Sequence, residues 1–211
     1  MKYIFTILAA LLIITQATAQ NEVRLGMGIN FGSTPSLKDY INQVAGYNEM
    51  ASFNSAVIFS GEYDHSFSNT FDLGLEVAYL LSSSTFNIGT GQYDFSYHII
   101  MPTITSYYVI RGEGYNFKFG GGVGVRLASA DESFPSSPSA INFTSTGFGF
   151  LLRAAGNTKL SDNFYVYISG DLRYDLNGDL NGWEQHHSTI YNQVDLNTFS
   201  AGVNLGITYM F

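Results

Sequence analysis

The last thirteen residues of the chain, 199–211, alternate strictly between two kinds of side chain. Even positions are mostly small or polar, whereas the odd positions carry Phe199, Ala201, Val203, Leu205, Ile207, Tyr209 and Phe211. Because successive side chains of a β-strand point to opposite faces, this segment predicts a strand with one continuous apolar face. Such a strand fits between a lipid phase and a wet interior, and we interpret it as the closing strand of a membrane β-barrel.

Seven earlier segments repeat this alternation, and the connections between them alternate in length. The predicted strands cover residues 23–32, 55–64, 70–81, 93–110, 116–128, 143–160 and 164–175. Four long connections (33–54, 82–92, 129–142 and 176–196) are separated by three tight turns (65–69, 111–115 and 161–163). An even strand number with short periplasmic turns and long outer loops is typical of bacterial outer-membrane barrels. We therefore predict an all-β fold: an eight-stranded antiparallel up-and-down transmembrane β-barrel with four long outer loops, whose first and last strands pair.

Two local features modify this pattern. The first long connection predicts a short helix over residues 36–45 with Ser36 as its N-cap, because Leu37, Tyr40 and Ile41 then share one face. Pro102 has no backbone N–H to donate, so it predicts a bulge or a locally unpaired position in the fourth strand.

The first nineteen residues predict a segment that is removed before folding. Lys2 precedes an apolar run at residues 3–14, and Ala17 and Ala19 form a small-residue cleavage site. That order is typical of a secretory signal peptide. The apolar run of twelve residues is short for a transmembrane helix, which needs about 20. We therefore expect residues 1–19 to be a signal peptide and residues 20–211 to form one outer-membrane barrel domain.

Composition supports a lipid-facing surface and excludes one class of partner. Charged residues make up 12 % of the chain and aromatic residues 16 %, whereas a soluble domain carries about 25 % charged residues. The chain has no cysteine, so disulfides do not stabilise it. A net charge of −8 with only nine Lys and Arg residues argues against a nucleic-acid partner.

Charged residues within the predicted strands fall on the polar face and are expected to point into the lumen. A charge at the lipid midplane would cost roughly 2–4 kcal/mol. Five of the residues are basic and four are acidic: Arg24, Glu62, Asp72, Glu76, Lys118, Arg126, Arg153, Asp171 and Arg173. The interior of an eight-stranded barrel is just wide enough for side chains to fill it, so opposite charges should pair into a structural plug. Inward glycines leave open the alternative of a narrow path for ions or small solutes.

Other candidate motifs fail at defining positions. Asp175, Asn177 and Asp179 alternate as in a calcium loop, but Leu180 occupies the position of the required glycine. A second candidate, a metal-ligand set of Glu184, His186 and His187, is weak because a metal site needs converging ligands. No serine and histidine have a supporting acid at motif spacing. We therefore expect no metal, no cofactor and no catalytic residues, and hence no enzymatic activity.

Several segments carry a family resemblance. They are Ala19 and Gln20 at the end of the signal peptide, IIMPTITSYYVI at 99–110, FKFGGGVGVRLA at 117–128 and the terminal strand. On these segments the chain resembles the PorT-type outer-membrane β-barrel family of Gram-negative bacteria. Met101 before Pro102, and Ser106 where Lys is common, depart from that family's pattern. The resemblance implies an outer-membrane barrel without catalytic residues and, for some relatives, a role in protein secretion.

These observations predict a small, non-enzymatic integral outer-membrane protein with a structural or loop-display role. Its expected partners are outer-membrane lipid, an unknown loop partner, and the outer-membrane assembly machinery, which would read Tyr209 and Phe211 as an assembly signal. One alternative is a narrow solute channel or a component of a secretion complex. A second is a soluble lipocalin-like barrel, which would turn its apolar faces inward toward a ligand and its charges outward.

Overall fold

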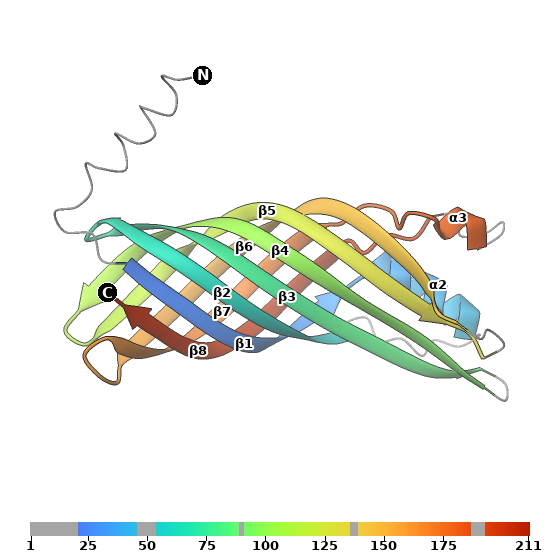
Figure 1. Cartoon of the computed structure of the whole chain (residues 1–211), viewed down its shortest axis with the longest axis horizontal. Coiled ribbons are helices and arrows are strands. Elements are labelled where there is room, and N and C mark those ends of the chain that lie inside the picture. The colour runs from blue at the N-terminus through green and yellow to red at the C-terminus, as the bar shows by residue number, and fades with distance from the viewer. Residues whose placement is uncertain (1–20, 46–53, 89–90, 136–138, 187–192) are drawn as a thin grey trace, which may run out of the picture.

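The computed structural model describes residues 21–45, 54–88, 91–135, 139–186 and 193–211. In this part of the chain, eight antiparallel strands form one closed sheet in sequence order (Figure 1). Their bounds are β1 Asn21–Ser33, β2 Asn54–Ser68, β3 Phe71–Ile88, β4 Gly91–Gly112, β5 Tyr115–Ser133, β6 Ile141–Lys159, β7 Phe164–Leu176 and β8 Thr198–Met210. The predicted fold class is therefore confirmed. The predicted signal peptide, residues 1–19, lies outside the described residues.

The first and last strands close the barrel, as predicted. β1 pairs with β8 from Glu22 opposite Met210 to Ser33 opposite Phe199. Backbone N–H groups of Asn21 and Phe211 each donate to the other residue's carbonyl at 2.9 Å. Closure matters because a backbone group in hydrocarbon has no water to bond with, and an open sheet edge would leave a row of such groups unpaired.

A tyrosine covers this seam from the lumen side. Gly26 of β1 lies directly opposite Gly206 of β8. A Cβ atom at Gly26 would lie 1.8 Å from the Tyr167 hydroxyl oxygen, and one at Gly206 would lie 2.5 Å from the Tyr167 ring. Both positions must therefore be glycine for the buried ring of Tyr167, on β7, to lie against the backbone of β1 and β8.

Outward-facing side chains form an apolar belt on all eight strands. Leu25 and Leu152 are 64 % exposed, and Ile104 is 60 % exposed. The alternating inward positions on the same strands carry the charged residues, which are buried. A soluble ligand-binding barrel would have the opposite arrangement, so the lipocalin-like alternative is wrong. In addition, no helix within the described residues is long and apolar enough to cross a membrane.

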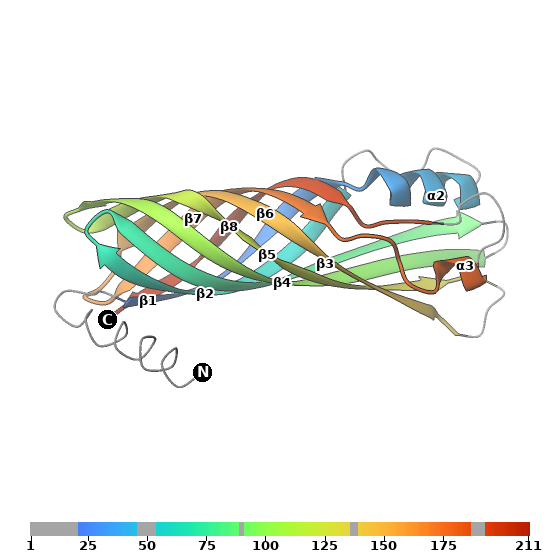
Figure 2. The ribbon, with the colours of Figure 1, turned by 90° about the horizontal axis from the view of Figure 1, so that it is seen from above.

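The strands β3 to β6 are longer than predicted and extend beyond the other four at the end opposite the termini (Figure 2). The expected long connection at residues 82–92 is instead mostly strand, because β3 continues to Ile88 and β4 begins at Gly91. Strand β5 likewise continues to Ser133. The sequence predicts loops for these Ser-, Thr- and Asn-rich segments because their apolar residues are no longer on the outward positions.

The alternation reverses in this extension. On β3 the outward positions change from apolar to polar above Leu81, where Ser83 and Thr85 are exposed. On β4 the inward positions carry Tyr93 and Phe95, which are 0 % and 1 % exposed. Near its outer end the barrel therefore has an apolar interior and a polar exterior, as a soluble protein does.

The helix in the first long connection, α2 (Pro35–Ala45), packs into this apolar interior (Figure 2). It begins one residue earlier than predicted, since Lys38 N–H donates to the Thr34 carbonyl at 3.0 Å. Proline suits the first helical position because its missing N–H would have no intrahelical partner there. The Ser36 hydroxyl, predicted to cap the helix, instead accepts a hydrogen bond from Asp195 N–H at 3.2 Å.

A second short helix, α3 (Trp183–His186), meets α2 across the interior. The Trp183 ring lies 4.7 Å from the rings of both Tyr40 and Phe143. We call the resulting cluster the apolar cap; its buried members are Leu37, Tyr40, Ile41, Ala56, Ile58, Ala78, Leu80, Tyr93, Phe95, Ile99, Met101, Ala128, Ala130, Phe143, Leu180, Trp183, Val194 and Leu196.

Pro102 interrupts pairing without a bulge. The β4–β5 ladder pairs Ile100 with Leu127 and Thr103 with Gly124, and it omits the two residues between them at an unchanged register. The second of the two predicted outcomes is therefore correct. The register shift that does occur lies between Ser66 and Ser68 at the end of β2.

Candidate functional site

The candidate site is the charged interior of the barrel. All nine charged residues predicted to face inward are buried, with exposed fractions from 0 % to 5 %. The structure adds four buried carboxylates that the sequence interpretation did not include: Glu22, Asp64, Glu132 and Asp175. Eight of the nine predicted residues join one continuous set of ion pairs, and the ninth, Arg126, belongs to a separate pair.

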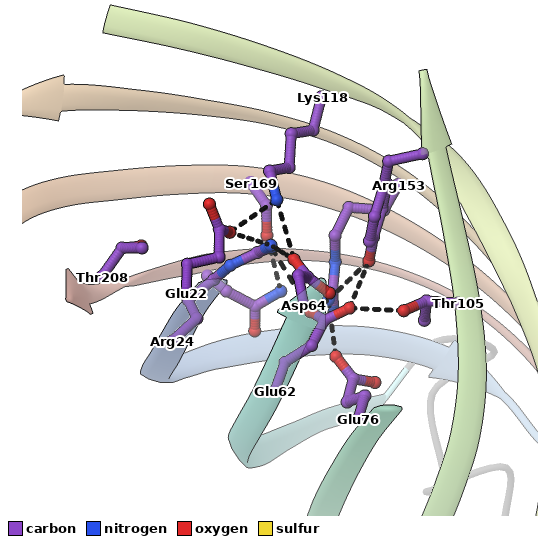
Figure 3. Close-up of polar contacts among 12 residues, drawn as sticks. Glu22, Arg24, Glu62, Asp64, Glu76, Thr105, Lys118, Arg153, Ser169 and Thr208 are labelled. Atoms are coloured by element: carbon purple, nitrogen blue, oxygen red, sulfur yellow. Dashed lines mark hydrogen bonds and ion pairs between the residues drawn. The ribbon is translucent and has the colours of Figure 1, made fainter. Parts of the chain in front are cut away.

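Lys118 of β5 holds three carboxylates near the end of the barrel that contains the termini. Its Nζ lies 2.5 Å from Glu22, 2.8 Å from Asp64 and 2.8 Å from Asp72 (Figure 3 shows the first two). Arg111 adds a second cation to Asp72 at 2.7 Å. Since Lys118 is 0 % exposed, these carboxylates replace the water that its ammonium group would otherwise bind.

Arg24 of β1 links this group to the next. Its guanidinium lies 2.7 Å from Asp64 and 3.4 Å from Glu62 (Figure 3). It also lies over two aromatic rings, with its Cζ 5.2 Å from the Tyr167 centroid and 5.7 Å from that of Tyr107. Tyr167 therefore contacts both the seam glycines and the charged interior.

Arg153 of β6 is the centre of the second group (Figure 3). It contacts Glu62 at 2.8 Å and Glu76 at 2.5 Å, and it makes a two-pronged contact with Asp171 at 2.6 and 2.8 Å. Arg173 adds contacts to Glu76 at 2.8 Å and to Asp171 at 3.2 Å. Paired nitrogen–oxygen contacts of the kind made with Asp171 match the planar guanidinium and are the stronger form of ion pair.

Glu62 joins the two groups, because it contacts both Arg24 and Arg153. It also accepts hydrogen bonds from Thr105 at 2.7 Å and from Tyr107 at 2.8 Å. We call the whole set the ion network; its members are Glu22, Arg24, Glu62, Asp64, Asp72, Glu76, Arg111, Lys118, Arg153, Asp171 and Arg173. It holds five cations and six carboxylates, so its charges nearly cancel.

Arg126 lies apart from the network, toward the outer end. It pairs with Asp175 and donates to the Thr103 hydroxyl at 3.2 Å. Asp175, the first residue of the candidate calcium loop, is thus a buried partner of Arg126. Asp179 instead forms an isolated β-bridge with Asp195.

Two of the missed carboxylates could have been predicted, because inward positions recur at every second residue of a strand. Asp64 is two residues after Glu62 on β2 and shares its face. Glu22 is two residues before Arg24, and the sequence interpretation excludes it only because β1 begins at Asn21 rather than at residue 23. The sequence therefore contains the signal for both residues, whereas it contains none for which cation each contacts.

The candidate metal-ligand set can be checked only within the described part of the chain. No group of three His, Cys, Asp or Glu residues there is arranged to hold a metal ion. The His186 ring lies 6.0 Å from the Phe143 ring at the edge of the apolar cap. His187, the other histidine of the candidate metal set, lies outside the described residues.

The two residues predicted as an assembly signal are adjacent on the lipid-facing side of the barrel wall, at the end that contains the termini. Tyr209 and Phe211 are 40 % and 54 % exposed, and their rings stack at 5.8 Å. Tyr209 also contacts Phe164 at 5.0 Å. They therefore form an aromatic group on the outward face, beside the short turn between β6 and β7.

Comparisons with known proteins identify the fold. No family model and no curated protein matches the chain, so the PorT-type resemblance stays a prediction. Similar solved structures include the attachment invasion locus protein Ail of Yersinia pestis, Neisserial surface protein A, and a major outer membrane protein from Thermus thermophilus. Ail has a TM-score of 0.55 at 13 % identity, covering 92 % of this chain and 99 % of its own.

The other two structures are also matched over almost their whole length at low sequence identity. Neisserial surface protein A has a TM-score of 0.53 at 13 % identity, covering 92 % of this chain and 99 % of its own. The Thermus protein has a TM-score of 0.56 at 14 % identity, covering 92 % of this chain and 100 % of its own. The chain therefore has the fold of the small outer-membrane β-barrel proteins.

Proposed function

We propose that this protein is an integral outer-membrane barrel with a sealed lumen, and that it displays its outer end to a partner outside the cell. The apolar cap carries this proposal. It joins α2, α3 and the extensions of β3 to β6 into one packed body instead of leaving them as separate loops. A rigid support for surface segments is how many proteins position binding residues.

The apolar belt supports the membrane location. Soluble monomers rarely expose a continuous apolar surface of more than a few hundred Å². Aromatic residues occur near both edges of the belt, with Phe71, Tyr108 and Tyr115 toward the short turns and Phe31 and Tyr174 toward the outer end. Membrane barrels have such aromatic girdles where the hydrocarbon meets the headgroups.

The charge of the outer end limits the kind of partner. Residues 34–53, 82–99, 128–147 and 177–197 contain seven Asp and Glu residues besides the buried Glu132, and a single Lys or Arg residue, Lys38. A surface of this composition repels polyanions and attracts cationic groups. We therefore propose that the partner is a basic protein surface rather than an acidic polymer.

Surface labelling of introduced cysteines tests the display function. Because the chain has no cysteine of its own, only the introduced thiol can react. We expect Thr85→Cys, in the outer extension, to react with a membrane-impermeant maleimide on intact cells. Glu113→Cys, in the turn between β4 and β5, is the matched control and should react only after the outer membrane is permeabilised. The reverse labelling would overturn the proposed orientation. Recovery of the wild-type protein in the soluble fraction without detergent would overturn the membrane location.

The alternative function is a narrow channel or a secretion-complex component. The ion network and the apolar cap argue against a channel, because they occupy successive levels of the same lumen. Planar bilayers in potassium chloride provide the test: we expect the purified wild-type protein to produce no conductance steps. Reproducible steps would favour the channel, and stable co-purification with secretion proteins would favour the complex.

The outward aromatic pair has a separate proposed role in assembly. We propose that the outer-membrane assembly machinery reads Tyr209 and Phe211 during insertion. Phe211→Ala should lower the amount of protein in the outer membrane without changing its synthesis. Phe67→Ala, which changes an aromatic residue at the end of β2 that is 53 % exposed, is the control. Equal membrane levels for the two variants would contradict this role.

A further inference from the structure

Four buried side chains on neighbouring strands have polar atoms with no hydrogen-bond partner among the described residues. The atoms are both amide atoms of Asn30, the hydroxyl of Ser200, Oδ1 of Asn204, and Nε and Nη1 of Arg173. Each of these residues is at most 2 % exposed. We call this group the polar patch. Such atoms are rare in folded proteins, because a buried polar group without a partner is destabilising.

The four residues are contiguous on the lumen wall. Arg173 of β7 is directly opposite Ser200 of β8. Asn30 of β1 is opposite Gly202, the next inward position along β8, and Asn204 follows at the position after that. A Cβ at Gly202 would lie 1.6 Å from Asn30 Oδ1, so the Asn30 side chain extends over β8.

The patch lies between the two packed regions of the lumen. Toward the short turns, the remaining nitrogen of Arg173, Nη2, contacts Glu76 and Asp171 of the ion network. Toward the outer end, β8 leads through Thr198 to Leu196, which is a buried member of the apolar cap. Within the described residues, neither region supplies a partner for the unpaired atoms of the patch.

We propose that the polar patch binds structural water molecules in the middle of the lumen. The chemistry of the unpaired atoms selects water. Donors are present on Arg173 and Asn30, acceptors on Asn30 and Asn204, and the Ser200 hydroxyl can act as either. Water both donates and accepts, and buried waters typically make about three hydrogen bonds to otherwise unpaired groups.

An ion satisfies this patch less well. A bound anion would pair with Arg173 but would leave the Asn30 and Asn204 oxygens without donors. A bound cation would pair with those oxygens but would lie beside the guanidinium of Arg173. The proposal concerns only the interior, and it does not depend on the proposed display function.

Nuclear magnetic resonance of the full-length protein in nanodiscs tests this directly. The probe is magnetisation transfer from water to side-chain amide protons in ¹⁵N-labelled protein, with Asn30→Leu used to assign the Asn30 signal. We expect a cross-peak from long-lived water to the Asn30 amide. An observable Asn30 amide without such a cross-peak would overturn the proposal.

Asn157 is the matched control. It is as buried as Asn30, at 1 % exposure. Its amide donates to Asn116 at 2.7 Å, and its carbonyl accepts from Thr208 at 2.9 Å. We expect its water cross-peak to be absent or much weaker. Cross-peaks of equal strength at both residues would overturn the assignment of water to the patch.

Two further measurements separate water from the other possibilities. In Ser200→Ala we expect the Asn30 cross-peak to weaken and the urea midpoint of unfolding to fall. A higher midpoint would overturn the proposal, since a dry patch gains stability when an unpaired hydroxyl is removed. Replacing chloride by bromide should leave the Arg173 Nε resonance unchanged, and a saturable shift would overturn the proposal in favour of an anion site.

Discussion

The two halves of this barrel use opposite arrangements of the same two kinds of side chain. In the membrane half, charged residues such as Arg153 are buried and leucines such as Leu75 are exposed. In the outer half, Phe95 and Trp183 are buried, while Ser83 and Thr85 are on the outside. Strands β3 to β6 run through both halves without a break. The comparison shows that the apolar residues of one strand change faces where its surroundings change from lipid to water.

The halves should also differ in how a lost contact affects them. Removing one cation of the ion network leaves several buried carboxylates with one opposite charge fewer, whereas trimming the apolar cap leaves a space among apolar groups. The following four experiments test this difference, from the largest expected effect to the smallest.

Arg153→Met should be among the most damaging changes. It leaves Glu62, Glu76 and Asp171 without their shared cation, and breaking a buried pair costs about 3–5 kcal/mol. Urea unfolding in detergent measures the loss. Arg111→Met is the control, because Arg111 is 25 % exposed and its partner Asp72 keeps Lys118. We expect a loss below about 1 kcal/mol there. Similar losses in both variants would contradict the central position of Arg153.

Trp183→Ala should damage the outer half alone. Truncation of a buried tryptophan costs about 3–5 kcal/mol, and the Trp183 ring contacts Tyr40 and Phe143. We expect faster proteolysis near α2 and α3, with the heat-modifiable gel mobility of the barrel retained. Gln185→Ala, an exposed change on the same helix, should stay within about 0.5 kcal/mol of the wild type. Loss of the folded gel form in Trp183→Ala would show that the two halves unfold as one unit.

A single charge placed on the outward face of β3 distinguishes the two environments. Leu75→Arg puts the charge in the belt, where it should cost about 2–4 kcal/mol. Ser83→Arg puts the same charge on the same outward face further along β3, in the polar extension. We expect a change within about 0.5 kcal/mol there. Equal costs in lipid bilayers would show that the belt does not end between these two positions.

The smallest effect concerns the hydrogen bond that Tyr40 donates to Glu132 at 2.6 Å. Tyr40→Phe should cost about 1 kcal/mol. Burial, and then Glu132, raise the pKa of Tyr40 above its usual value. The folded protein therefore retains the phenol proton when the unfolded chain loses it, at about pH 10. The contribution of Tyr40 is full below that pH and declines above it.

The measurement is the difference in unfolding free energy between the wild type and Tyr40→Phe across the alkaline range. The difference should be constant below about pH 9 and should shrink above about pH 10. Tyr115→Phe, which removes an exposed hydroxyl at the start of β5, serves as the control for the substitution itself. A difference that grows with pH would contradict the sign of the pKa shift.

The sequence predicted the membrane half well because one rule applied throughout. The outward odd positions of β8 and nine of the inward charges followed from a period of two, whereas Glu22, Asp64, Glu132 and Asp175 were not included. The same rule failed above Leu81, where apolar residues move to the other parity: Leu81 faces out, but Phe86 packs against the apolar cap. The alternation itself continues there, with the apolar residues moved from odd to even positions of β3. A prediction that allowed for this change would have found the outer end of β3 and the start of β4.

The pairings within the lumen were beyond sequence reasoning for a geometric reason. Arg153 and Glu62 are 91 residues apart in the chain and meet only across the interior. Which side chains share a level depends on how far each strand is shifted along its neighbour, and that shift is a property of the closed ring. The sequence predicted that opposite charges would pair, but it could not predict the partners.

The seam between β1 and β8 also has a consequence for how the protein folds. Its contacts join Glu22 to Met210, across almost the whole length of the chain, whereas each other ladder joins strands that are consecutive in sequence. Contacts between such distant residues carry the largest loss of chain entropy and form slowly. We therefore expect the sheet to grow hairpin by hairpin, with the Tyr167 ring settling over Gly26 and Gly206 as the last step. Substitutions of Tyr167 would then speed the opening of the ring more than they slow the growth of the sheet.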